Sequence, residues 1–111
     1  SSVYLELNKK YYGSDIISDE QIAYEWARIP HFYYNFYVYQ YATGYSAAIA
    51  LSQRILKENG KDDYINFLKG GSSKYSIDLL KGAGVDMTST EPFDKAMAVF
   101  SSLLDMMENE F

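Results

Sequence analysis

Apolar residues recur every three to four positions along most of the chain, and glycines separate the runs. The clearest run predicts a helix that begins near Thr90 and Pro92 and extends towards Glu110. The apolar residues of this run share one helical face and are Phe93, Ala96, Val99, Phe100, Leu103, Leu104 and Met107. We also expect helices over residues 3–12, 62–69 and 75–81, each of which a glycine follows.

A capping box near the N-terminus predicts another helix. Ser18 supplies a capping hydroxyl and Gln21, three residues later, supplies the side chain that reaches back. We expect this helix to run through Arg28. Pro30 then interrupts it, because proline has no amide hydrogen, although proline suits the first turn of a following helix. We therefore expect the chain to bend at Pro30.

Two patterns compete over residues 31–57. Tyr37, Tyr39 and Tyr41 alternate as in a strand, whereas the continuation, rich in alanine and leucine, favours a helix. We predict a helix, because a strand of this length without turn residues would be unusual. Its residues are apolar on several faces, which is typical of a buried helix. One stripe of this helix would be His31, Tyr34, Val38, Tyr41, Tyr45, Ala48 and Ile55. Asn59-Gly60 predicts its end.

The predicted fold class is therefore all-α. We expect residues 1–111 to form a single compact domain of about five helices around a long, aromatic-rich central helix. With 48% apolar residues, the chain has enough material for a core of that size.

Charge and composition exclude several classes of function. The net charge is −5 and no run of basic residues is present, so nucleic acid is not expected as a partner. The longest apolar stretch, residues 47–51, is far too short to cross a membrane. With 1 His and 0 Cys, the commonest zinc ligands cannot be assembled three or four at a time.

Aromatic residues are unusually abundant and unevenly placed. The chain has 12 Tyr, 6 Phe and 1 Trp, and ten of these residues lie between Tyr24 and Tyr45. Core packing would explain the rings. It does not explain the hydroxyls, because a buried hydroxyl without a partner costs about 1–3 kcal/mol. The tyrosines therefore indicate a face that meets water, a polar network or a polar ligand such as a peptide backbone. His31 and a tyrosine hydroxyl could both donate a hydrogen bond to an oxyanion.

The segment from Trp26 to Gly44, with Pro30-His31-Phe32-Tyr33 inside it, resembles the C-terminal part of oligoendopeptidase F. That enzyme group lies in the thimet oligopeptidase-like family of zinc metallopeptidases. Residues 10–13, 64–73 and 79–87 resemble neighbouring segments of the same family. Its members carry a His-Glu-x-x-His helix whose histidines bind zinc, and this motif is absent from the sequence. The resemblance thus implies the C-terminal part of a larger metallopeptidase, inactive alone.

The resemblance also implies roles for single residues. In the family, a His and tyrosines of this segment line the cleft opposite the zinc, bind the peptide and stabilise the tetrahedral intermediate. Carried over, it implies His31, Tyr37 and Tyr39 as catalytic residues and Tyr34 and Tyr41 as substrate-binding residues. Sequence matching favours Tyr37 and Tyr39, whereas helical periodicity groups Tyr34 and Tyr41 with His31. The zinc would belong to the parent enzyme, and we expect none to be bound by this chain.

The expected partners are an oligopeptide substrate and the remainder of the parent catalytic domain, in the bacterial cytoplasm, with no nucleic acid and no membrane. The isolated chain should expose an aromatic patch and form a homodimer. A competing interpretation is a small helical module without catalytic role, whose tyrosine-rich face binds a partner helix or peptide. A longer gene with His-Glu-x-x-His upstream would decide between the two.

Overall fold

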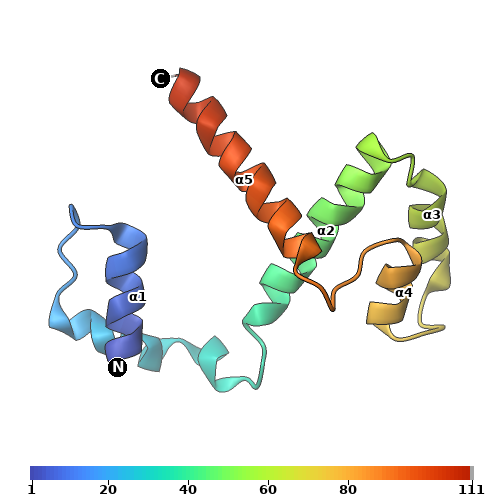
Figure 1. Cartoon of the computed structure of the whole chain (residues 1–111). Coiled ribbons are helices and arrows are strands. Elements are labelled where there is room, and N and C mark those ends of the chain that lie inside the picture. Colours follow the sequence, from blue (N-terminus) through green and yellow to red (C-terminus); the bar gives the residue numbers. More distant parts are fainter. Residues whose placement is uncertain (111) are drawn as a thin grey trace. The chain divides into compact units, whose positions relative to one another are not determined.

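A computed structural model describes residues 1–110, which form helices and no strand (Figure 1). The all-α prediction is confirmed. The α-helices are α1 (Ser2–Tyr12), α2 (Tyr39–Lys57), α3 (Lys61–Gly70), α4 (Ser76–Gly82) and α5 (Glu91–Glu110). Two 3₁₀ helices, η1 (Glu20–Arg28) and η2 (Pro30–Tyr33), lie between α1 and α2.

The chain divides into two units. The first contains Ser1–Tyr39, and the second contains the described residues from Gln40 onward. The expectation that residues 1–111 form a single domain of a larger metallopeptidase stays a prediction.

The first unit packs α1 against η1, and the cap at the start of η1 differs from the predicted one. Asp19, not Ser18, caps η1: its carboxylate accepts hydrogen bonds from the amides of Gln21 at 2.8 Å and Ile22 at 3.1 Å. The hydroxyl of Ser18 instead donates to the side-chain oxygen of Asn8 in α1, at 2.7 Å. The Ser18 side chain therefore makes a tertiary contact instead of the helix cap that the capping box predicted.

The helix predicted over residues 31–57 begins later, at Tyr39. Pro30 starts a new turn as expected, but that turn is the short η2, which ends at Tyr33. Phe36 then adopts a left-handed backbone with φ 54°, which no continuous right-handed helix contains. The stripe that joined His31 and Tyr34 to Tyr41 on one helix is therefore wrong.

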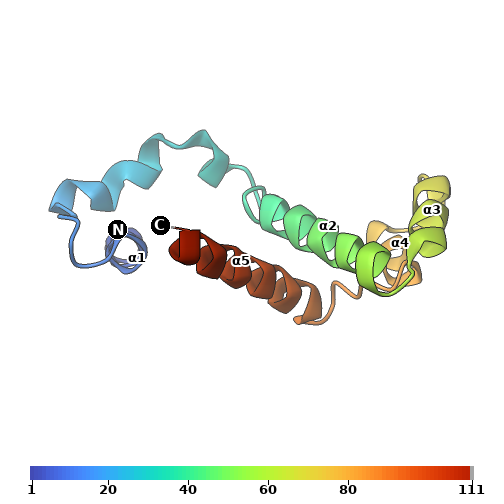
Figure 2. The same ribbon diagram turned by 90° about the horizontal axis from the view of Figure 1, so that it is seen from above.

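The second unit is built on α2, whose buried residues are serine, alanine and leucine rather than tyrosine. Its buried residues are Ser46, Ala47, Ala50 and Leu51. Tyr41 and Tyr45 are 65% and 63% exposed, so the expected burial on several faces is not met. Ala50 and Leu51 pack with Ala83 and Val85 from the segment after α4. The contacting helices α3 and α4 lie beside the C-terminal end of α2 (Figures 1 and 2).

The end of α2 follows the predicted Asn-Gly signal. Asn59 has a left-handed φ of 57°, and the carbonyl of Arg54 accepts hydrogen bonds from the amides of Glu58 and Gly60, both at 3.0 Å. The Arg54 guanidinium pairs with Glu58 at 3.0 Å and with Asp63 of α3 at 3.1 Å. This side chain therefore ties α2 to α3.

Gly84 lies directly against this arginine. Its φ is 81°, and a Cβ built there would stand 2.3 Å from Cζ of Arg54. No side chain fits between the two residues, because real Cβ contacts do not come that close. Glycine at this position thus lets the Arg54 guanidinium lie over the turn that leads from α4 towards α5.

Candidate functional site

The aromatic residues around His31 lie on a sharply turning part of the first unit. η1 ends at Arg28, and the Ile29 amide donates to the Trp26 carbonyl at 3.1 Å. η2 follows at once with Pro30, whose fixed φ suits a helix start. Phe36 then adopts a left-handed backbone before α2 begins. His31 therefore sits on a single helical turn between the end of η1 and the left-handed Phe36.

His31, Tyr34 and Tyr37 form one group of aromatic rings, here called the ring cluster. The ring centroids of His31 and Tyr37 are 5.6 Å apart and their planes differ by 28°, which is a stacked arrangement. Tyr34 meets both rings edge-on, at 6.4 Å from His31 and 5.7 Å from Tyr37. Edge-on and offset contacts at these distances are the favourable geometries for aromatic pairs. The turn after Pro30 therefore brings three of the expected site residues together.

The ring cluster is partly exposed to solvent. His31 is exposed, Tyr34 is 58% exposed and Tyr37 is half-buried. An imidazole N–H and a phenol O–H are both hydrogen-bond donors. The cluster can therefore present donors to a ligand oxygen while its rings support one another.

Tyr39 and Tyr41 are placed differently. Both lie in the first turn of α2 and are 57% and 65% exposed. Tyr41 belongs to the second unit, whereas Tyr39 is the last residue of the first. The structure thus groups His31, Tyr34 and Tyr37 by contact, and the roles expected for Tyr39 and Tyr41 stay predictions.

Two neighbours of His31 that the sequence did not single out hold η2 in place. The hydroxyl of Tyr33 donates to the Ala27 carbonyl at 2.8 Å, and its ring lies 6.3 Å from that of Trp26. The ring of Phe32 meets Tyr4 of α1 edge-on at 6.5 Å. Their signal in the sequence is their position directly after the only imidazole.

Tyr4 also carries a perturbed hydroxyl. Desolvation raises the pKa of the Tyr4 phenol, and the negative charge of Glu25 raises it further, since the Glu25 carboxylate accepts a hydrogen bond from this hydroxyl at 3.4 Å. Arg28 also pairs with Glu25. Tyr4 therefore stays a neutral donor that supports Phe32.

Residues 1–110 do not form a zinc site. Within the described part, residues 1–110, no group of three His, Cys, Asp or Glu side chains could hold a metal ion. The ring cluster contributes one imidazole and two phenols, and phenols are not among the usual zinc ligands.

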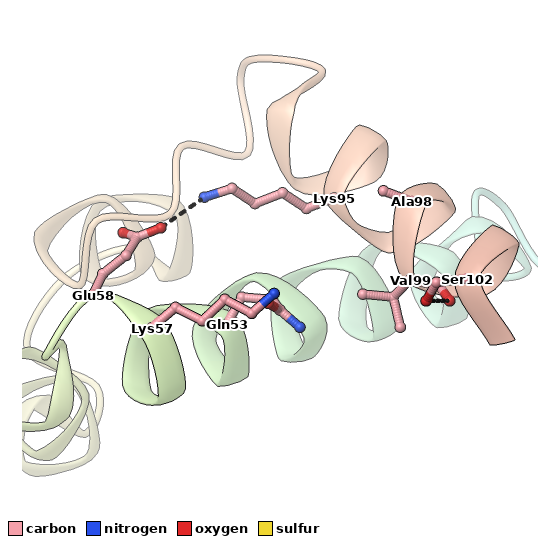
Figure 3. Close-up of a pocket in the computed structure, with 7 residues that line it drawn as sticks. All are labelled: Gln53, Lys57, Glu58, Lys95, Ala98, Val99 and Ser102. Carbon is pink, nitrogen blue, oxygen red and sulfur yellow. Dashed lines mark hydrogen bonds and ion pairs between the residues drawn. The ribbon is translucent and has the colours of Figure 1, made fainter. Parts of the chain in front are cut away.

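A groove in the second unit is a further candidate (Figure 3). Its volume is about 410 Å³, and α2 and α5 line it with Gln53, Lys57, Glu58, Lys95, Ala98, Val99 and Ser102. Lys95 pairs with Glu91 at 2.9 Å and with Glu58 at 3.6 Å. The hydrogen bond to Glu91 raises the pKa of Lys95, and Glu58 adds to this effect. The Ser102 hydroxyl donates to the Val99 carbonyl at 2.9 Å. Two charged residues of the groove, Glu58 and Lys95, thus pair with each other. The ring cluster is the stronger candidate, because it brings three of the expected site residues together.

Helices capable of crossing a membrane were sought in the described residues, and none is long and apolar enough.

Comparison with known proteins places these features in a family. Residues 1–99 match the family described as "Peptidase family M3". The chain is 63% identical to "Oligopeptidase PepF" of Bacillus subtilis (strain 168) over 97% of its own length and 16% of that protein. It is 50% identical to "Group B oligopeptidase PepB" of Streptococcus agalactiae, over 98% of this chain and 18% of that protein. The chain thus spans less than a fifth of these two relatives.

A solved structure is similar as well. The crystal structure of oligoendopeptidase-F from Enterococcus faecium superposes with a TM-score of 0.86 at 44% sequence identity. The match covers 97% of this chain and 21% of that one. The helical arrangement described above is therefore that of one part of a larger protein.

Proposed function

The chain belongs to peptidase family M3, a family of metallopeptidases, and from this membership we propose that it is the C-terminal part of a zinc metalloendopeptidase that cleaves oligopeptides. Its relatives carry the names oligopeptidase and oligoendopeptidase F and are several times longer than this chain. The remainder of the parent catalytic domain is its first partner, and an oligopeptide is its substrate. The bacterial cytoplasm is the proposed location.

The observation that carries the proposed role is the ring cluster. It holds the only imidazole of the chain against two phenols, and the rings of His31 and Tyr34 are exposed. Peptide cleavage creates a negatively charged oxygen, and donors placed where that charge develops lower the barrier. We propose that His31 and Tyr37, together with Tyr39, stabilise this oxyanion, and that Tyr34 and Tyr41 bind the peptide.

The zinc of the parent enzyme is proposed to be held outside this chain. A single His with 0 Cys does not supply the usual ligand set, and the ring cluster is an assembly of donors. The chain therefore acts on the substrate and not on the metal, so that it has no activity alone.

The test uses the full-length peptidase that contains this segment. His31→Gln, Tyr37→Phe and Tyr39→Phe should each lower kcat by about tenfold to a thousandfold, as the loss of one oxyanion donor does. Bound zinc, measured by atomic absorption, should stay at the parent level. Tyr75→Phe is the matched control, because Tyr75 is 85% exposed and lies in the second unit. Parent-like turnover in all three variants would refute the assignment.

The chain isolated from its parent is proposed to form a homodimer. α5 leaves large apolar side chains exposed, among them Phe100 and Met107, each at 57%. Exposed apolar patches of this kind mark surfaces that associate. Sedimentation at micromolar concentration should give a dimer, and a strictly monomeric species would contradict this.

A further inference from the structure

His31 is carried by a short turn whose end hydrogen bonds are long. η2 is four residues long, and at its two ends the Phe32 amide donates to the Ile29 carbonyl at 3.2 Å and the Tyr34 amide donates to the His31 carbonyl at 3.4 Å. Both distances are at or beyond the long end of ordinary N–H···O bonds. A turn of this kind needs side-chain contacts to hold one orientation.

Tyr33 provides such a contact, at a carbonyl that Pro30 would otherwise leave without its helical donor. In a 3₁₀ helix, each carbonyl accepts from the amide three residues later. For Ala27 that residue is Pro30, which has no amide hydrogen. The Tyr33 hydroxyl donates to this carbonyl instead, at 2.8 Å. One side chain of η2 thereby closes the end of η1.

The two rings that follow His31 fix the turn from both sides. Tyr33 lies against Trp26 of η1, with centroids 6.3 Å apart, while Phe32 meets Tyr4 of α1 at 6.5 Å. Phe32 and Tyr33, the two residues after His31, are thus held in place. The His31 ring stacks on the Tyr37 ring, with centroids 5.6 Å apart. The direction of the imidazole therefore depends on where Tyr33 holds the turn.

We infer that Tyr33 is a positioning residue for His31: its hydroxyl replaces, at the Ala27 carbonyl, the amide hydrogen that Pro30 lacks, and so aims the imidazole at the substrate. The inference rests on the proposed function, because the orientation of His31 matters only if His31 donates to the substrate. Tyr33 itself touches neither metal nor substrate in this role.

The first experiment is Tyr33→Phe in the full-length peptidase. This change keeps the ring on Trp26 and removes only the donor. We expect kcat to fall about three- to tenfold, which is the effect of losing one neutral hydrogen bond, with KM and bound zinc near the parent values. Tyr24→Phe is the matched control, because it removes a hydroxyl from a 72% exposed residue of η1, and it should leave kcat unchanged. An unchanged kcat in Tyr33→Phe would overturn the inference.

Two double variants separate positioning from general support of the fold. If Tyr33 acts through His31, adding Tyr33→Phe to His31→Gln should lower kcat no further. In a Pro30→Ala background, which returns an amide hydrogen to residue 30, Tyr33→Phe should cost less than it does in the parent. Equal losses of kcat in all three backgrounds would overturn the inference, because a merely structural tyrosine would give that result.

The His31→Gln variant alone distinguishes a failure of the proposed function from a failure of the role of Tyr33. A strong loss of kcat in His31→Gln, together with no loss in Tyr33→Phe, would overturn only the role of Tyr33. Parent-like turnover in His31→Gln would remove the proposed function and the role of Tyr33 with it.

Discussion

Replacement of Gly84 by alanine tests the packing of the second unit at its tightest point. A Cβ at this position would stand 2.3 Å from Cζ and 2.6 Å from Nε of Arg54, so the guanidinium has to move. We expect that movement to disrupt its ion pairs with Glu58 at 3.0 Å and Asp63 at 3.1 Å. The φ of 81° is a second obstacle, since side chains other than glycine rarely adopt it.

The magnitude follows from these two effects. A left-handed backbone costs about 1–2 kcal/mol for an alanine. Each partly exposed ion pair contributes about 0.2–1 kcal/mol. We therefore expect Gly84→Ala to lower the free energy of local opening by about 1.5–4 kcal/mol, which corresponds to an increase of about tenfold to several hundredfold in the open population.

Amide hydrogen exchange in the full-length peptidase measures this population directly. The Val85 amide, which donates to the Leu80 carbonyl at 2.9 Å, should exchange faster by that factor. Gly82→Ala is the matched control. A Cβ at Gly82 meets nothing within 4 Å, and alanine is the better helix former at the end of α4. Equal exchange in Gly84→Ala and the parent would refute the reasoning, and so would equal acceleration in Gly82→Ala.

Asp19→Ala should lower the free energy of unfolding, measured with urea, by about 0.5–2 kcal/mol, as the loss of an N-cap does. Ser18→Ala should lower it less, and the reverse order would indicate that Ser18 is the cap. Asn59→Ala should cost about 1 kcal/mol and Asn59→Gly almost nothing, because of the left-handed φ of 57°. Hydrogen bonds from Thr88 lower the pKa of Asp86 from 3.8 to about 2. The Asp86 carboxylate thus stabilises the folded state fully above pH 3.8, and this stabilisation is lost as the pH falls through about 2. An Asp86 titration followed by NMR with a midpoint near 3.8 would contradict this.

Helix boundaries could be predicted from the sequence where the covalent structure of a residue decides them. Pro30 and Pro92 mark helix starts because proline fixes φ, and Asn59 marks a helix end because asparagine tolerates a left-handed backbone. The cap of η1 could not be chosen in this way. Ser18 and Asp19 are both good capping residues, and the choice between them depends on Asn8, ten residues before Ser18, which binds the Ser18 hydroxyl.

The ring cluster was only partly within reach of sequence reasoning. The resemblance singled out His31 and Tyr37, and the structure stacks them. Their contact depends on Phe36, whose left-handed backbone has no signal in the sequence, because such a conformation is uncommon outside glycine. Tyr33 could have been found from one local rule. A proline three residues after Ala27 leaves a carbonyl without its donor, and a tyrosine follows three residues later.

The hydrogen bond from Gly60 to Arg54 also bears on how the protein ages chemically. An asparagine followed by glycine is the sequence most prone to deamidation, because the glycine nitrogen attacks the asparagine side chain and closes a succinimide ring. Here that nitrogen is buried and its hydrogen is donated to the Arg54 carbonyl at 3.0 Å. Asn59 is therefore shielded for as long as the last turn of α2 stays closed. Aspartate and isoaspartate at position 59 should accumulate during storage only as fast as this turn opens. The amount of these products therefore measures how often the turn opens.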